Sequence, residues 1–208
     1  VNRVVVANVL RETVAWSFTL SGAVIAGALF ALVSGVVFDS DLASVVQEIE
    51  AVFAQISQQL DQSVVIPSGT MMLAISAWMI TLSTVVSLFV SRWWQALLYN
   101  PGGFQEEFHG LRLESKLGLS LAILLGAGVL LPDDYRIWVQ LASIPLMLAG
   151  LALVHYWVKA KVKSSRWLVF VYFGLILYSP IMMALLVLVG LADSFMNLRT
   201  RLMSDTHG

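Results

Sequence analysis

Long apolar runs alternate with short polar segments along this chain. Runs of membrane length with few or no charges cover about 14–38, 70–90, 113–131, 137–158 and 167–192. A helix of about 20 apolar residues crosses the ~30 Å hydrocarbon core of a bilayer. The pattern therefore predicts an all-α, polytopic transmembrane bundle of about five spans, built as a single membrane domain over residues 1–208.

Two further segments show one-sided helical periodicity instead of a continuous apolar run. The first, 39–62, carries acidic side chains and no basic one, which predicts an extracytoplasmic amphipathic helix that serves either as a solvated lid or as a docking face. The second follows a turn signal at Asn100, Pro101, Gly102 and Gly103. It predicts a short cytoplasmic helix at the membrane interface, near residues 104–111.

Small residues recur every four positions in two of the predicted spans. The stripes are Ala23, Gly27, Ala31 and Gly35 in the first span, and Gly118, Ala122 and Gly126 in the third. Small side chains allow two membrane helices to approach closely. We expect ordinary helix packing along both stripes.

Composition removes several classes of protein. Hydrophobic residues make up 59% of the chain and charged residues only 12%, about half the share typical of a soluble domain. The net charge of −1 lacks the basic footprint of a nucleic-acid binder, so no nucleic-acid partner is expected. The chain contains no cysteine, which excludes disulfides, thiolate catalysis and thiolate metal sites within it.

Lysine and arginine in the short loops predict the orientation. Loop 39–69 has none and loop 132–136 has one, whereas loop 92–116 has three and loop 159–166 has four. The last two loops should therefore be cytoplasmic in a bacterial inner membrane. Five spans then place the C-terminal tail outside, although Arg199 and Arg201 favour the cytoplasm, so the two indications conflict.

The spans offer little catalytic chemistry. His155 is the one histidine inside a predicted span, and a helix–helix hydrogen bond is its expected role. Glu106, Glu107, Glu114 and His109 have ligand chemistry but not the spacing of a metal motif. We therefore expect no cofactor, no metal and no enzyme activity. Aromatic and hydroxyl side chains in the second and fifth spans leave a neutral small-molecule ligand possible.

Two motifs together resemble a known family. The first is Arg92-Trp93-Trp94, followed by Tyr99-Asn100-Pro101-Gly102-Gly103-Phe104 and Glu107-Phe108; the second begins at Gly190 and includes Asp193, Asn197, Arg199 and Arg201. This combination is similar to the YybS-like family of predicted bacterial integral membrane proteins, a family defined by a domain of unknown function. That family is loosely similar to the substrate-binding S components of energy-coupling-factor transporters. Its members look longer at the N-terminus, and the chain starts at Val1, so a preceding portion is expected.

These observations favour a membrane protein that binds rather than catalyses. The expected partners are the lipid bilayer and other membrane proteins, for which the chain would act as a subunit or scaffold. The alternative is an S-component-like carrier of a small, mostly apolar solute. Asp193 follows an uncharged run and is costly near lipid unless paired, so we expect an ion pair with Arg199, Arg201 or a basic residue of another helix. The candidate structural or interaction residues are Trp93, Trp94, Asn100, Pro101, Gly102, Gly103, Asp193, Arg199 and Arg201.

Overall fold

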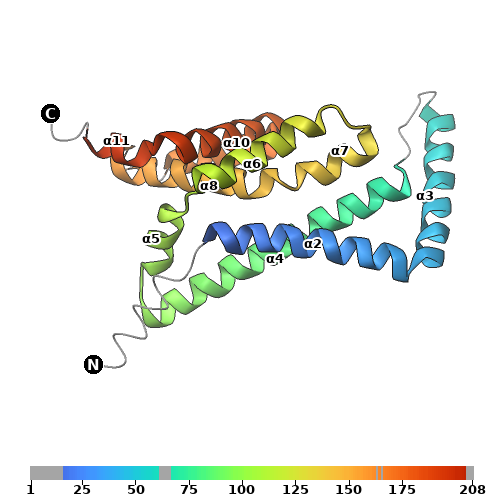
Figure 1. The fold of residues 1–208 in the computed structure, drawn as a ribbon, viewed down its shortest axis with the longest axis horizontal. Coiled ribbons are helices and arrows are strands. Elements are labelled where there is room, and N and C mark those ends of the chain that lie inside the picture. The colour runs from blue at the N-terminus through green and yellow to red at the C-terminus, as the bar shows by residue number, and fades with distance from the viewer. Residues whose placement is uncertain (1–15, 61–66, 163, 165, 205–208) are drawn as a thin grey trace.

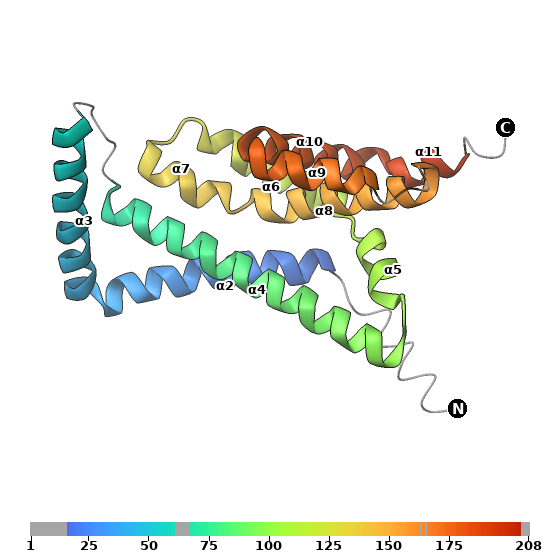
Figure 2. The same cartoon turned by 180° about the vertical axis from the view of Figure 1, so that it is seen from behind.

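The protein is a bundle of helices with one further helix lying across each end. The computed structural model describes residues 16–60, 67–162, 164 and 166–204, and within these residues every element is helical. Figures 1 and 2 show the long helices running along one axis, with α3 (Asp39–Leu60) and α5 (Gly103–Gly110) lying across opposite ends. The helical fold class is as expected, and both helices that were predicted outside the spans are present.

The first two long helices, α2 (Trp16–Val37) and α4 (Gly69–Tyr99), form an antiparallel pair. A Cβ added at Gly27 would collide with Thr81 of α4, and one added at Gly35 would collide with the Leu73 side chain. The small-residue stripe of the first span thus packs on α4, as predicted. In lipid, such close van der Waals contact is what holds two apolar helices together.

The remaining helices form a second group. It comprises α6 (Ser115–Gly128), α7 (Asp133–Gln140), α8 (Ser143–Trp157) with a π-helical extension η1 (Val158–Val162), α9 (Arg166–Leu177), α10 (Ser179–Met196) and α11 (Leu198–Ser204). The tightest packing in this group is between α8 and α10, which cross at Gly150 and Gly190. Of the second predicted stripe, Gly118 packs on Ser194 of α10, whereas Gly126 has open space beside it.

Several expected spans have different boundaries in the structure. Among the described residues, four segments are long and apolar enough to cross a membrane: α2, α4, α8 with most of η1 (Ser143–Lys161), and α10. The expected third span, 113–131, is the shorter helix α6 followed by a turn. The fourth, 137–158, begins inside α7 and is broken before α8, while the second continues beyond residue 90 to Tyr99.

The prediction of one span over 167–192 is wrong, because the chain reverses near Pro180. The helix α9 ends at Leu177 and α10 begins at Ser179, and Gly174 lies against Met182 across the turn. Residues eight apart in one helix would be about 12 Å apart along its axis, so this contact requires a hairpin. The reversal returns α10 and α11 to the end of the bundle where α5 lies (Figure 1).

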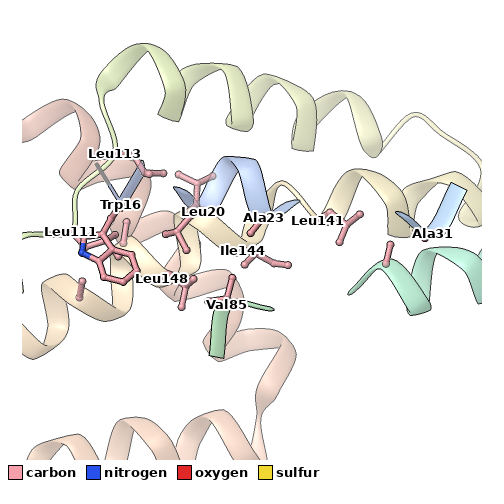
Figure 3. Packing of buried hydrophobic residues seen from close by; sticks show 14 residues of the cluster. Trp16, Leu20, Ala23, Ala31, Val85, Leu111, Leu113, Leu141, Ile144 and Leu148 are labelled. Atoms are coloured by element: carbon pink, nitrogen blue, oxygen red, sulfur yellow. The ribbon is translucent and has the colours of Figure 1, made fainter. Parts of the chain in front are cut away.

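A small core joins the two groups of helices. Figure 3 shows Leu20 of α2 beside Ile144 and Leu148 of α8, with Val85 of α4 close by. Leu20 and Ile144 are fully buried, and the connection between α5 and α6 adds Leu111 and Leu113. At the end of the bundle that carries α5, this core includes Trp16, Leu111 and Leu113, and it fixes there the elements that build the site described next.

Candidate functional site

Asp193 is buried at the end of α10, where the chain turns sharply. Its Oδ2 lies 3.4 Å from the guanidinium of Arg199, and its Oδ1 accepts a hydrogen bond of 2.9 Å from the Leu198 N–H. Asn197 has a φ of +46°, in the left-handed region that asparagine tolerates better than most residues. This turn folds Arg199 back over the carboxylate, so the ion pair expected for Asp193 is present and its partner is Arg199.

The segment between α5 and α6 binds the same end of α10. The guanidinium of Arg112 donates to the carbonyls of Asp193 and Ser194 at 2.9 and 3.0 Å, and the Ser115 hydroxyl donates to the Ser194 carbonyl at 2.6 Å. The last carbonyls of a helix lack partners within it and carry partial negative charge, which a cation stabilises. Arg199 also donates to the Leu111 carbonyl at 2.5 Å, while Arg201 lies exposed on α11.

The turn after α4 directs α5 across the end of the bundle. Asn100 caps α4, its N–H donating to the Ala96 carbonyl at 2.8 Å, and Pro101 follows. Gly102 has a φ of +91°, which strongly favours glycine. A Cβ on Gly103 would collide with the Asn100 side chain. The predicted turn is therefore confirmed.

The last turns of α4 carry the Arg-Trp-Trp sequence. Arg92 forms a bidentate ion pair with Glu107 of α5, with a shortest distance of 2.6 Å. Trp93 and Trp94 contact each other edge to face and remain about half exposed. Exposed tryptophans beside a basic residue are typical of the membrane–water interface.

A cavity of about 540 Å³ opens between α5, η1 and α11. Its walls include His109, Tyr156, Lys159, Arg199 and Glu106. His109 is only 8% exposed, and its pKa is lowered to about 4, mainly by burial and further by the charges of Lys159, His155 and Arg199. Its ring is therefore neutral at physiological pH. The guanidinium of Arg199 lies over the Tyr156 ring, 5.9 Å from its centroid.

An aromatic groove of about 390 Å³ adjoins this cavity, and His109 lines both. The groove is formed mainly by apolar and aromatic side chains of α4, α5, α8 and α9, among them Phe89, Trp93, Phe104, Phe108, Leu151 and Tyr172. His155 lies between α8 and α9 and forms a hydrogen bond of 2.8 Å with the Tyr172 hydroxyl. The helix–helix hydrogen bond expected for His155 is thus present.

This end of the bundle combines polar and aromatic side chains. No group of three or more potential metal-ligating side chains occurs among the described residues. The rings of His109 and His155 lie 6.3 Å apart, centroid to centroid, and each packs on aromatic neighbours. What the site offers is two cations and a neutral imidazole beside an aromatic groove.

The structure brings the two sequence motifs together at one end of the bundle. Leu111 and Arg112 follow the first motif, and they bond to Arg199, Asp193 and Ser194 of the second. The roles of His109, Tyr156 and Lys159 in one cavity were missed from the sequence. The available signal was weak: His109 directly follows Phe108 on a short helix, and nothing in the spacing connects it with residues about 50 positions later.

A scan against protein-family models and searches of curated proteins and of solved structures find no match to this chain. The resemblance to the YybS-like family therefore stays a prediction.

Proposed function

We propose that this chain is a non-enzymatic subunit of a bacterial inner-membrane assembly, and that its α9–α10 hairpin packs against a transmembrane helix of another protein. The observation that supports this is the position of the hairpin tip. At 1.5 Å per residue, the 12 residues of α9 extend about 18 Å, well short of the ~30 Å hydrocarbon core. Starting from the basic end of the bundle, α9 therefore ends inside the membrane.

The arrangement of the helices agrees with this depth. Figures 1 and 2 show that the α9–α10 tip ends short of both the α6–α7 turn and α3. The side chains around the tip are apolar and exposed: Ile176 is 79% exposed and Ile181 64% exposed. The tip is thus an outward-facing reversal of the chain at membrane depth.

Backbone groups at such a reversal need partners. The Gly174 carbonyl accepts a bond from the Tyr178 N–H, but within the described chain the carbonyls of residues 175–177 receive no backbone bond. Irregular backbone is tolerated at membrane depth only where protein or water covers it, because each unsatisfied group in lipid costs several kcal/mol. A neighbouring helix with a hydroxyl or amide side chain at this depth would supply the missing donors.

Site-specific photo-crosslinking in native membranes tests the proposal. A photoreactive amino acid at Ile176 or Ile181 should give a discrete adduct with another membrane protein. The same group at Ile123, which is 63% exposed on α6, is the matched control and should react with lipid alone. Lipid adducts alone at all three positions would contradict a protein partner, and a product of two copies of this chain would replace the heteromeric subunit with a self-associating one.

The alternative of a carrier for a small apolar solute has one observation in its favour. A cavity of about 440 Å³ between α2 and the α6–α8 segment is lined almost wholly by apolar side chains, including Val24, Leu121 and Trp138. Its volume is in the range of small-molecule sites. Native mass spectrometry after purification in mild detergent distinguishes the two: a small molecule retained without a protein partner would favour the carrier.

A further inference from the structure

The cavity beside His109 has the features of an anion site. Two cations among the described residues line it from different elements, Lys159 from η1 and Arg199 from α11. Burial lowers the pKa of Arg199, Asp193 raises it, and the nearby guanidinium of Arg112 lowers it further. Among the described residues of its wall, Glu106 is the one acidic side chain, and the carboxylate of Asp193 lies behind Arg199 as its ion-pair partner. Burial, and then the charges of Lys159, His155 and Arg199, lower the pKa of His109, and no acidic group among the described residues raises it, so positive charge predominates around the imidazole.

Polar groups in the wall have bonding capacity to spare. The ring of His109 makes ring contacts and no hydrogen bond within the described residues, so its nitrogens are available to a ligand in the cavity that the residue lines. The side chain of Arg199 is only 11% exposed, and its Nε atom is buried without a hydrogen-bond partner among the described residues. Buried polar groups are normally hydrogen-bonded, and an unsatisfied one requires an explanation. A bound acceptor in the cavity would provide it.

The neighbouring aromatic groove indicates what else the ligand carries. Because His109 lines both spaces, a molecule with its anionic group at Lys159 and Arg199 reaches the groove past the imidazole. Phe104, Phe108 and Leu151 offer an apolar surface there, and the exposed Trp93 at the rim is the kind of residue found at headgroup level. A free inorganic anion would leave this groove unused.

We propose that this end of the bundle binds a phosphorylated amphiphile, with its phosphate held by Lys159, Arg199 and His109 and its apolar chain in the groove between α4, α5, α8 and α9. A phosphate monoester carries up to two negative charges and several acceptor oxygens, which matches two cations and one neutral imidazole donor. The inference is independent of the hairpin partner, since the hairpin tip around Ile176 and Ile181 contributes no residue to the cavity or to the groove.

A titration by native mass spectrometry tests the site on the whole chain in neutral maltoside micelles. The probes are dioctanoyl phosphatidic acid, dioctanoyl phosphatidylcholine and inorganic phosphate. Phosphatidic acid should bind saturably and at least about tenfold more tightly than either of the others. K159Q should weaken its binding about tenfold, the usual effect of losing one charge-assisted contact. K161Q, a change of the same charge on the same short helix but outside the cavity wall, should leave the binding unchanged.

Two further variants separate the headgroup from the chain. H109F keeps an aromatic ring but removes the imidazole donor, and it should weaken phosphatidic acid binding; thermal unfolding measured in parallel shows whether the variant is folded. L151W should fill the groove, so it should weaken the binding of phosphatidic acid and leave the binding of inorganic phosphate unchanged. Equal affinity for phosphatidylcholine, or equal losses in K159Q and K161Q, would overturn the proposal. Inorganic phosphate binding as tightly as phosphatidic acid would overturn the amphiphile and leave a free-phosphate site.

Discussion

Gly150 of α8 and Gly190 of α10 lie against each other, so that the two backbones touch where these helices cross. A Cβ built on Gly150 would collide with the Leu186 carbonyl oxygen, and one on Gly190 with the Leu146 carbonyl oxygen. Both obstacles are backbone atoms, which cannot rotate away as a side chain can. Close contact of this kind is the main source of helix association in lipid, and it fixes α10 and therefore Asp193.

Substitution of either glycine should separate α8 from α10. We expect Gly150→Ala or Gly190→Ala to lower the free energy of unfolding by about 1–3 kcal/mol, the usual cost of overpacking. Thermal unfolding in maltoside, followed by circular dichroism, measures the effect. Gly126→Ala is the control, because nothing lies within 4 Å of its added Cβ. Equal melting temperatures for all three variants would show that the crossing is looser than described.

Removal of the Asp193 carboxylate charge should be strongly destabilising. Asp193→Asn leaves Arg199 buried without its counter-ion, and breaking a buried pair costs about 3–5 kcal/mol. Asp133→Asn is the matched control, since Asp133 forms an exposed pair with Arg136 that contributes at most about 1 kcal/mol. Similar unfolding temperatures for the two variants would mean that the Asp193 pair is solvated.

Acid should weaken the fold through His109. Its pKa is about 4 in the folded chain and near 6.5 when exposed, so between these values the unfolded chain takes up a proton that the folded chain does not. Stability from this residue is therefore lost as pH falls from about 6.5 to about 4 and is unaffected at higher pH. The drop in melting temperature between pH 7.5 and pH 4.5 should be smaller in His109→Phe than in the wild-type protein. An identical drop in both would contradict this assignment.

The sequence predicts the helices that obey a simple period well. The small stripe around Gly27 and the acidic periodicity of 39–62 depend on local spacing, and both elements form as expected. The turn at Gly102 and the pairing of Asp193 could also be predicted from the sequence. A backbone with positive φ favours glycine, and a carboxylate near lipid needs a cationic partner. The cavity around His109 could not be predicted, since it is formed by three elements that are far apart in the sequence.

The reversal at Pro180 is the main failure of the sequence-based prediction, and its reason is physical. Proline is tolerated inside a membrane helix as a kink and at the first turn of a new helix, and hydropathy does not distinguish the two cases. Here Pro180 lies in the first turn of α10, and Gly174 gives Met182 room to pack across the hairpin. The reversal also removes the conflict over the tail, because α11, which carries Arg199 and Arg201, lies at the same end of the bundle as α5 (Figure 1).

This arrangement predicts which end of the bundle faces the cytoplasm. The lysines and arginines of loops 92–116 and 159–166 should face the cytoplasm, and α11 then lies on that side with them. Because the chain has no cysteine, single-cysteine variants report one position each. In intact cells, an impermeant maleimide should label Gln58→Cys on α3, but should label Ser164→Cys and Thr200→Cys only after the membrane is permeabilised. A continuous fifth span would instead place Thr200 with Gln58, so labelling of Thr200→Cys in intact cells without labelling of Ser164→Cys would refute the hairpin.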